Sequence, residues 1–314
     1  MASFLLRSFS LLIAVATAGA AAPITLSLSE AHGFNLLTWG NASLINSDTE
    51  GRVAVGGNAT FSSYSIGTHA GAGNPAQAAF VVGGNLSAGH GQVYNGSIFV
   101  GGSYSGPGYA LNSAPGSTLS SGLGAGLPFD FGAAQAALTA KSTTYGAADA
   151  TGSTLLQWST LTLTGTGDDL NIFELSAAQL ASASGLVIDV AQGSRVLVNV
   201  TGQAATFQNM GIFTSASANN ILFNFHEATS LSLSGIGVIG SILAPHADVF
   251  FQSGQMNGQL VAKSFSGASW GVGELHHHPF NNDTPPPSVP DAAATGGLVG
   301  FALLGLGWLA RRRR

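Results

Sequence analysis

A short apolar run that ends in Gly-Gly and a small polar residue occurs three times in the first third of the chain. The copies are VAVGGN at 53–58, FVVGGN at 80–85 and IFVGGS at 98–103, and a looser copy, IGVIGS, lies at 236–241. Runs of Val, Ile and Phe favour a pleated strand, and we expect each glycine pair to allow a turn with positive φ. Each copy therefore predicts one short strand followed by one tight corner.

The glycine pairs are separated by 27 residues, from Gly56 to Gly83, and then by 18 residues, from Gly83 to Gly101. This spacing is irregular, but it is typical of stacked structural repeats. One such coil is unable to bury its apolar side alone, so the copies must pack on one another. We therefore predict a parallel β-solenoid. The alternative is a β-sandwich whose hairpins use Gly-Gly turns.

The low charge of the chain limits the partners that it can bind. Only 7% of the residues are Asp, Glu, Lys or Arg, and the formal net charge is -5. The basic patch of a nucleic-acid binder is missing, so we exclude nucleic acid as a partner. A surface solvated by Ser, Thr, Asn, Gln and Gly suits carbohydrate, ordered water or another protein. The chain has no cysteine, which excludes disulfides and thiolate metal sites.

The first residues predict export. Residues 1–20 contain one basic residue, a short apolar stretch and small residues in an A-x-A arrangement, Ala18 and Ala20. This pattern is typical of a secretory signal peptide, and we expect cleavage after Ala20. The apolar run is shorter than the roughly 20 residues that span a bilayer, which argues against a membrane anchor at this end.

The last residues predict a sorting signal. A proline-rich linker at 281–288 precedes residues 289–314, which resemble the PEP-CTERM class of bacterial sorting signals in its VPD-type variant. The motif residues are Val289, Pro290, Asp291, Arg311, Arg312, Arg313 and Arg314. The resemblance implies a transmembrane helix, transient anchoring and processing by an exosortase-type enzyme. Asp291 is followed by Ala-Ala-Ala rather than the usual Ser-Gly, and a plain tail anchor is the alternative.

The segment 129–145 changes from strand-like to helical periodicity. It is rich in alanine, and Asp130 is placed to cap a helix. One side of this helix would carry Phe131, Ala134, Leu138 and Lys141. We expect the helix to lie beside the coils.

Shorter patterns complete the domain predicted at 23–280. Residues 176–180 predict a brief helix, with Ser176 and Gln179 as a capping box. The Gly- and Ser-rich stretch 101–128 predicts a loop. From residue 155 onward the apolar runs predict further strands.

Several motifs in this domain occur in an order that resembles the choice-of-anchor A domain of bacterial surface proteins. They are FN at 34–35, DTEGRVAVGGN at 48–58, GSILAP at 240–245, NGQL at 257–260 and GELH at 273–276, followed by Phe280. That family is similar to ice-binding-like adhesive β-solenoids. The resemblance implies a mostly β fold, a right-handed parallel β-solenoid with a flanking α-helix. It implies no catalytic residue and no cofactor.

The histidines at 276–278 are candidate metal ligands because imidazoles bind divalent cations. Adjacent residues of an extended chain point to opposite sides, so at most His276 and His278 share one. Only Glu274 is an acidic neighbour in sequence. A solvated or hydrogen-bonded cluster is the simpler interpretation, and we predict no metal site.

Carboxylates and hydroxyls offer other candidates. Asp168 with Asp169, and Asp48 with Glu50, could serve as calcium ligands or as the acid pair of a glycosidase. We interpret the first pair as a turn, and we expect Glu50 to form an ion pair or a hydrogen-bonded corner with Arg52.

Asparagine and threonine patterns have two interpretations each. Six Asn-x-Ser/Thr sequons invite glycosylation, but Asn58 and Asn85 follow Gly-Gly corners, where side-chain hydrogen bonds to the backbone are the simpler role. Thr38 and the alternating threonines of 160–164 could form a face that orders water. One such strand is too little to predict ice binding.

Taken together, these patterns predict an exported adhesive or structural protein associated with exopolysaccharide or biofilm. The first alternative is a polysaccharide-acting enzyme on a β-helix, which should place Asp, Arg and Lys in a groove. Lys and Arg together number only nine, and four of them are the terminal arginines. The other alternative is an ice-binding protein.

Overall fold

The computed structural model describes residues 24–282, apart from 72–73, 75, 107–109, 113–114 and 168. The predicted signal peptide at 1–20, the linker beyond residue 282 and the sorting signal at 289–314 lie outside the described residues, so these remain predictions. A search of the described residues for a membrane-spanning helix, judged by length and apolar character, found none.

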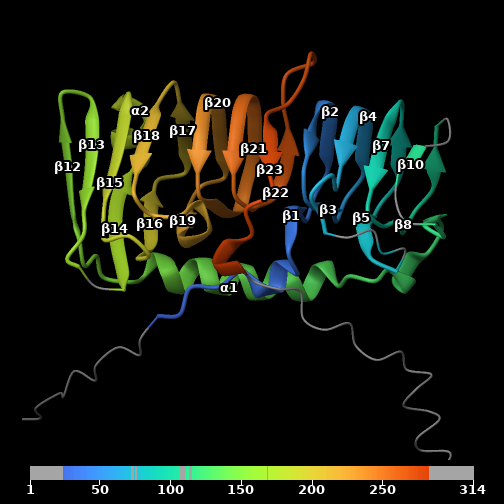
Figure 1. Ribbon diagram of the computed structural model, residues 1–314, viewed down its shortest axis with the longest axis horizontal. Helices are drawn as coiled ribbons and strands as arrows, with labels where there is room; N and C mark the ends of the chain where they lie inside the picture. The colour runs from blue at the N-terminus through green and yellow to red at the C-terminus, as the bar shows by residue number, and fades with distance from the viewer. Residues whose placement is uncertain are drawn as a thin grey trace, which may run out of the picture.

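The described chain winds into parallel coils with three faces, and one long helix lies along the stack (Figure 1). The face covered by α1 (Phe131–Gly146) is called the helix face. Its strands, in spatial order, are β14 (Leu170–Ser176), β16 (Arg195–Thr201), β19 (Ile221–Asn224), the start of β21 (Ser241–Asn257), the start of β22 (Leu260–Ser266), β1 (Phe34–Thr38), β3 (Arg52–Val55), β5 (Ala78–Val82), β8 (Ser97–Val100) and β11 (Leu119–Ser120). The predicted parallel, mostly β architecture is confirmed, while its right hand stays a prediction.

The second face is called the hydroxyl face, because most of its outward side chains are Ser or Thr. Its strands are β17 (Ala204–Gln208), the first half of β20 (Ser230–Ile239), the middle of β21, the end of β22, the first halves of β2 (Ala42–Thr49) and β4 (Ala59–Ile66), β6 (Leu86–Ala88) and β9 (Tyr104–Ser105). Strands β20, β21, β22, β2 and β4 therefore turn corners and serve more than one face.

The third face contains the remaining strands of the same large sheet. They are the ends of β20, β21, β2 and β4, with β23 (Glu274–His276), β7 (Gly91–Tyr94) and β10 (Ala110–Asn112). A separate four-stranded sheet holds β12 (Ser153–Gln157), β13 (Thr160–Thr164), β15 (Gly185–Asp189) and β18 (Gly211–Thr214). The short 3-10 turns are η1 (Ser29–Ala31), η2 (Gly124–Gly126), η3 (Ala218–Asn220) and η4 (Phe280–Asn282).

The chain does not wind from one end of the stack to the other. It begins in the middle at β1 and winds outward to β11, and α1 then carries it back past the middle to the far end (Figure 1). The second half winds inward from β13 until β22 pairs with β1 in parallel, Leu36 opposite Leu260. The junction of β22 and β23 with β1 and β2 is called the seam. Residues about 225 apart in sequence are neighbours there.

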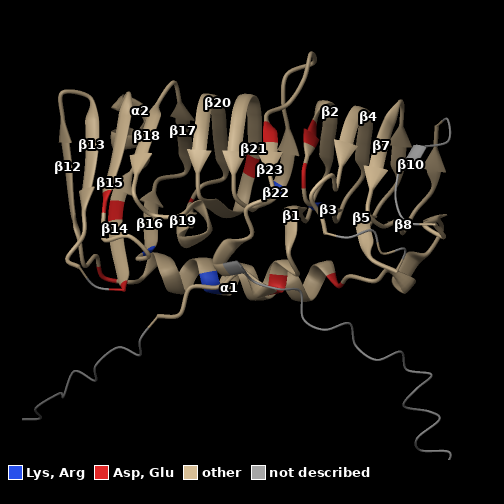
Figure 2. Cartoon of the chain, viewed as in Figure 1, with Lys and Arg blue, Asp and Glu red and all other residues tan. Residues whose placement is uncertain are grey.

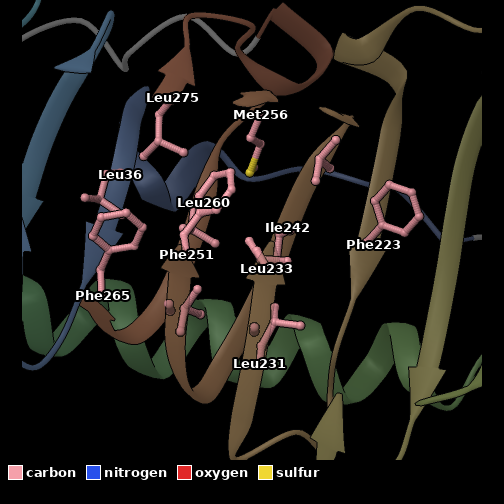
Figure 3. Packing of buried hydrophobic residues seen from close by; sticks show 14 of the residues in the cluster. Leu36, Phe223, Leu231, Leu233, Ile242, Phe251, Met256, Leu260, Phe265 and Leu275 are labelled. Atoms are coloured by element: carbon pink, nitrogen blue, oxygen red, sulfur yellow. The ribbon is translucent and has the colours of Figure 1, made fainter. Parts of the chain in front are cut away.

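Strands of the helix face are buried on both sides, which explains their unbroken apolar runs. Inward residues such as Leu36, Val53 and Phe80 stack in register within the coils. Their outward neighbours, such as Leu37 and Ala54, pack in the layer beneath α1. Figure 3 shows the interior near the seam, where residues from both halves interlock: Leu36, Phe223, Leu231, Leu233, Ile242, Phe251, Met256, Leu260, Phe265 and Leu275.

The flanking helix begins where it was predicted. Asp130 is its N-cap, and its side chain accepts a hydrogen bond from the Ala133 amide at 2.9 Å. Ala134 and Leu138 are buried as expected, but Lys141 is only partly buried and pairs with Glu30. Ser142 and Tyr145 are buried instead.

The brief helix α2 (Ala177–Ser182) has the predicted capping box between Ser176 and Gln179. The prediction of a loop over 101–128 was partly wrong, because this stretch also contains β9, β10, β11 and η2. Strands of two or three residues are too short to show the apolar alternation that identifies a strand in sequence. They continue ladders that the preceding coils provide.

The glycine pairs mark the corners, but the predicted reason was wrong. None of the six glycines in the three copies has φ in the left-handed region. They are required because successive coils approach closely: a Cβ on Gly83 would lie 2.2 Å from the carbonyl oxygen of Gly56, and one on Gly101 would lie 2.3 Å from that of Gly83. The glycines therefore permit backbone stacking, not an unusual turn.

Candidate functional site

The hydroxyl face carries one outward row of small polar side chains that crosses both halves of the solenoid. In-register pairing between neighbouring strands aligns Thr206, Ser232, Phe250, Ser266, Ser43, Thr60, Ser87 and Ser105. Alternate residues point inward and are buried, as in Ala59, Phe61 and Leu86. Adjacent strands lie about 4.8 Å apart, so the row repeats hydroxyls at nearly that interval.

An asparagine ladder borders this row, at the corners after Gly40 and after the first two glycine pairs. The side-chain oxygen of Asn41 accepts from the Asn58 amide, that of Asn58 accepts from the Asn85 amide, and that of Asn85 accepts from the Ser103 amide, each at 2.8 Å. The prediction that Asn58 and Asn85 satisfy backbone groups is confirmed. These bonds hold the edge of the hydroxyl face in a fixed geometry.

The threonines that could have formed a water-ordering face, Thr38 and those of 160–164, do not form one. Thr38 is fully buried, and its hydroxyl donates to the carbonyl of Gly40. Thr162 on β13 lies opposite Val187 on β15, and Val187 lies opposite Phe213 on β18, so these strands do not continue a threonine row. The observed row was missed because each coil contributes a single residue to it, and these residues lie far apart in sequence.

At the seam, residues of the DTEGR and GELH motifs join the two halves. Glu50 accepts a hydrogen bond from the His277 amide at 2.8 Å, and its own amide donates to the carbonyl of Leu275 at 2.9 Å. Asn35 accepts from the Gly51 amide and donates to the carbonyl of Gly258. These motif residues therefore hold neighbouring coils together at the seam by hydrogen bonds.

The predicted ion pair of Glu50 with Arg52 was wrong, although Glu50 does form a hydrogen-bonded corner. The Arg52 guanidinium instead donates to the carbonyl of His32 and lies 4.5 Å from the centre of the Phe34 ring. The Glu50 carboxylate faces His69 at 3.4 Å. Glu50 and Gly51 form the bend between β2 and β3, so Glu50 and Arg52 do not share a strand and their side chains face different partners.

The histidine cluster is spread over different partners. The ring of His276 contacts the Asn257 side chain at 2.7 Å and the Glu274 carboxylate at 3.3 Å. Burial disfavours the charged form of His277 and so lowers its pKa. In the part of the chain that the structure describes, no three His, Asp or Glu side chains are grouped as a metal site. Asp169 precedes β14, and Asp168 lies outside the described residues.

Asp48 is the least satisfied charged group at the seam. Its Oδ1 is buried and has no hydrogen-bond partner among the described residues. Burial raises the pKa of Asp48, and the carboxylates of Glu274 and Glu50 raise it further, while His276 and His69 act in the opposite direction. In Figure 2, segments coloured as Asp or Glu lie near one another where β21 and β23 meet β2.

We expect Asp48→Asn to raise the midpoint of thermal unfolding at about pH 7 and to change it little at about pH 3, below the ordinary carboxyl pKa. A raised carboxyl pKa gives stability that is present in acid and lost as pH rises through the folded-state value. Circular dichroism melts at the two pH values measure this difference. Asp248→Asn is the control of opposite sign, because hydrogen bonds from Ser264 and Lys263 lower the pKa of Asp248. A loss of stability in Asp48→Asn at neutral pH contradicts the assignment.

Comparison with known families decides the identity of this fold. Residues 27–277, most of the chain, match the profile of the ice-binding-like adhesive domain. The chain belongs to that family. No curated protein matches this chain in sequence.

Two solved structures are similar to this ice-binding-like adhesive domain. One is an ice-binding protein from the Antarctic ascomycete Antarctomyces psychrotrophicus, with 15% identity, 81% of this chain and 98% of that chain covered, and a TM-score of 0.42. The other is an ice binding protein from an Antarctic Biological Consortium, with 12% identity, 85% and 96% covered, and a TM-score of 0.31. At these scores neither similarity bears on function.

Proposed function

We propose that this ice-binding-like adhesive domain is displayed outside a bacterial cell, where its hydroxyl face holds a neutral polysaccharide of the surrounding matrix. The outward row of Ser and Thr is the observation that supports this proposal, because it offers repeated hydrogen-bonding groups on a nearly uncharged surface. A polymer of hydroxylated rings can match such a row at several points. Many weak contacts then act together.

Display outside the cell rests on the sequence signals. Cleavage of residues 1–20 would release the domain from the export machinery, and an exosortase-type enzyme would process residues 289–314. The choice-of-anchor A resemblance supports the same location. The lack of cysteine is compatible with a location inside or outside the cell, so it does not distinguish between them.

The hydroxyl face supports binding better than catalysis. Glycoside hydrolysis uses a pair of carboxylates placed about 5 to 10 Å apart across the scissile bond. The depression on this face is lined by one carboxylate, Asp248, and that carboxylate is already paired with Lys263 at 2.9 Å. The residues of this face therefore fit a binding role better than glycoside hydrolysis, which needs a second carboxylate.

The test is co-sedimentation of the full chain with insoluble neutral polysaccharides. Replacing two exposed row residues, Ser87→Lys and Ser105→Lys, should weaken binding about tenfold, because two bulky charges would be desolvated against a neutral polymer. The matched control is Ser153→Lys with Gln157→Lys on β12, which is exposed but lies off the row. Equal loss in both double variants, or no binding by the unaltered chain, contradicts the proposal.

Ice binding is a second candidate function, favoured by the family and by the regular spacing of the same row. The interruption by the exposed Phe250 counts against it, because an ordered water layer needs an uninterrupted lattice match. Thermal hysteresis of the full chain that is abolished by the Ser87→Lys and Ser105→Lys double variant would favour ice over polysaccharide.

A further inference from the structure

The hydroxyl face is not flat at the seam, where it is hollowed by a shallow groove. On this face β22 pairs with β2 at a single position, Phe265 opposite Ala42, whereas β2 pairs with β4 along most of its length. The two halves are therefore paired less extensively here than neighbouring coils are elsewhere on this face. The depression has a volume of about 480 Å³, which is within the range of small-molecule sites.

The walls of this seam groove are polar and come from both halves. Side chains of Ser43, Asn58 and Thr60 line it from the N-terminal half, and those of Asp248, Lys263 and Ser266 line it from the C-terminal half. Such a lining offers hydroxyl, amide, carboxylate and ammonium groups within one small volume. A ligand with many hydroxyls can both donate and accept there.

The charges in the groove cancel and are held in place. Lys263 Nζ lies 2.9 Å from Asp248 Oδ2, and the Ser264 hydroxyl donates to Asp248 Oδ1 at 2.6 Å. Both charged side chains are 55% exposed, so they can also reach a ligand. Because the pair is neutral as a whole, the groove favours a neutral ligand over a strongly charged one.

An aromatic ring stands beside the groove. Phe250 is 39% exposed and lies two residues after Asp248 on β21, so both side chains point outward. Its strand register places it next to Ser266, which lines the groove. Among the described residues of the hydroxyl row, Phe250 is the one large apolar side chain.

We propose that the seam groove binds one neutral pyranose unit of the polysaccharide, with its C–H face on Phe250 and its hydroxyls on Asp248, Lys263 and Ser266. A sugar ring has an apolar face and a polar edge, which is the combination that this groove presents. The inference rests on the proposed function and adds to it a defined site and ligand class. The row would then hold the neighbouring units of the polymer.

The test uses the full chain on an array of hexasaccharides of glucose, mannose, galactose, glucosamine and glucuronic acid. We expect a neutral hexasaccharide to bind best, and Phe250→Ala to weaken that binding about tenfold or more. Phe250→Trp should retain it. The matched control is Phe213→Ala, since Phe213 is also exposed, at 65%, but lies on the four-stranded sheet. Circular dichroism melts verify that each variant folds.

The outcomes separate this inference from the proposed function. Suppose that Phe250→Ala binds hexasaccharide and polymer like the unaltered chain, while the Ser87→Lys and Ser105→Lys double variant loses polymer binding. The seam groove is then not the pyranose site, and the proposal that the hydroxyl face binds polysaccharide is kept. Preference for glucosamine or glucuronic acid oligomers overturns the neutral ligand class. If neither polymer nor any hexasaccharide binds, both proposals fall.

Discussion

Replacing Gly83 by alanine is expected to destabilise the domain by about 3 kcal/mol or more, since the added methyl group meets backbone atoms that have no room to move. The new Cβ would lie 2.2 Å from the carbonyl oxygen of Gly56. The backbone on both sides is fixed by ladder bonds, from the Gly83 amide to Val55 and from the Gly101 amide to Val82. Relief of the clash requires that two coils separate locally. This loss is a large part of the 5–15 kcal/mol that stabilises a typical domain.

Urea unfolding followed by circular dichroism measures this difference in the free energy of unfolding. The matched control is Gly126→Ala, because Gly126 is exposed and an added Cβ there meets no atom within 4 Å. It should change stability by no more than about 0.5 kcal/mol. Similar stability of the two variants would show that the corners are looser than the stacked backbones indicate.

The elements that were predictable from sequence are those specified by neighbouring residues. The cap at Asp130 and the capping box at Ser176 need only residues three positions away, and both are present. The glycine corners were located correctly because the apolar strand and its end are adjacent. The reason that glycine is needed there was not predictable, since it depends on the distance to the backbone of the next coil.

The order of the coils was not predictable, because an apolar run does not specify which other run it pairs with. Nothing in the sequence of β22 identifies β1 as its partner, although the two strands are in register from Leu36 to Thr38. The roles of Glu50 and Asn35 at the seam depend on that pairing. The seam groove could not be foreseen for the same reason.

A buried polar network beneath α1 was also missed, although the sequence contains a signal for it. Asn199 and Asn224 end the similar runs VLVN and ILFN, which lie 25 residues apart, and their strands pair in register. A polar residue at the same position of two paired, otherwise apolar strands indicates a shared partner. That partner is the helix.

The network contains four hydrogen bonds, and three of them join α1 to the sheet. The side-chain amide of Asn224 donates to the Ser142 carbonyl and to Asn199 Oδ1, each at 2.9 Å. Asn224 Oδ1 accepts from the Ser142 hydroxyl at 2.6 Å. The side-chain amide of Asn199 donates to the Tyr145 carbonyl at 2.6 Å. All four residues are buried, so each bond lost leaves a polar group without access to water.

We therefore expect Asn224→Ala to destabilise the domain by about 3 to 5 kcal/mol, since three hydrogen bonds are lost and their partners stay buried. Urea unfolding measures the loss, and Asn220→Ala is the control, because its amide makes one exposed bond to Gly193 and should matter by less than about 1 kcal/mol. Asn199→Ala combined with Asn224→Ala should cost less than the sum of the single variants, because the two asparagines share a bond. Strict additivity would mean that Asn199 and Asn224 hold α1 independently and do not act as one network.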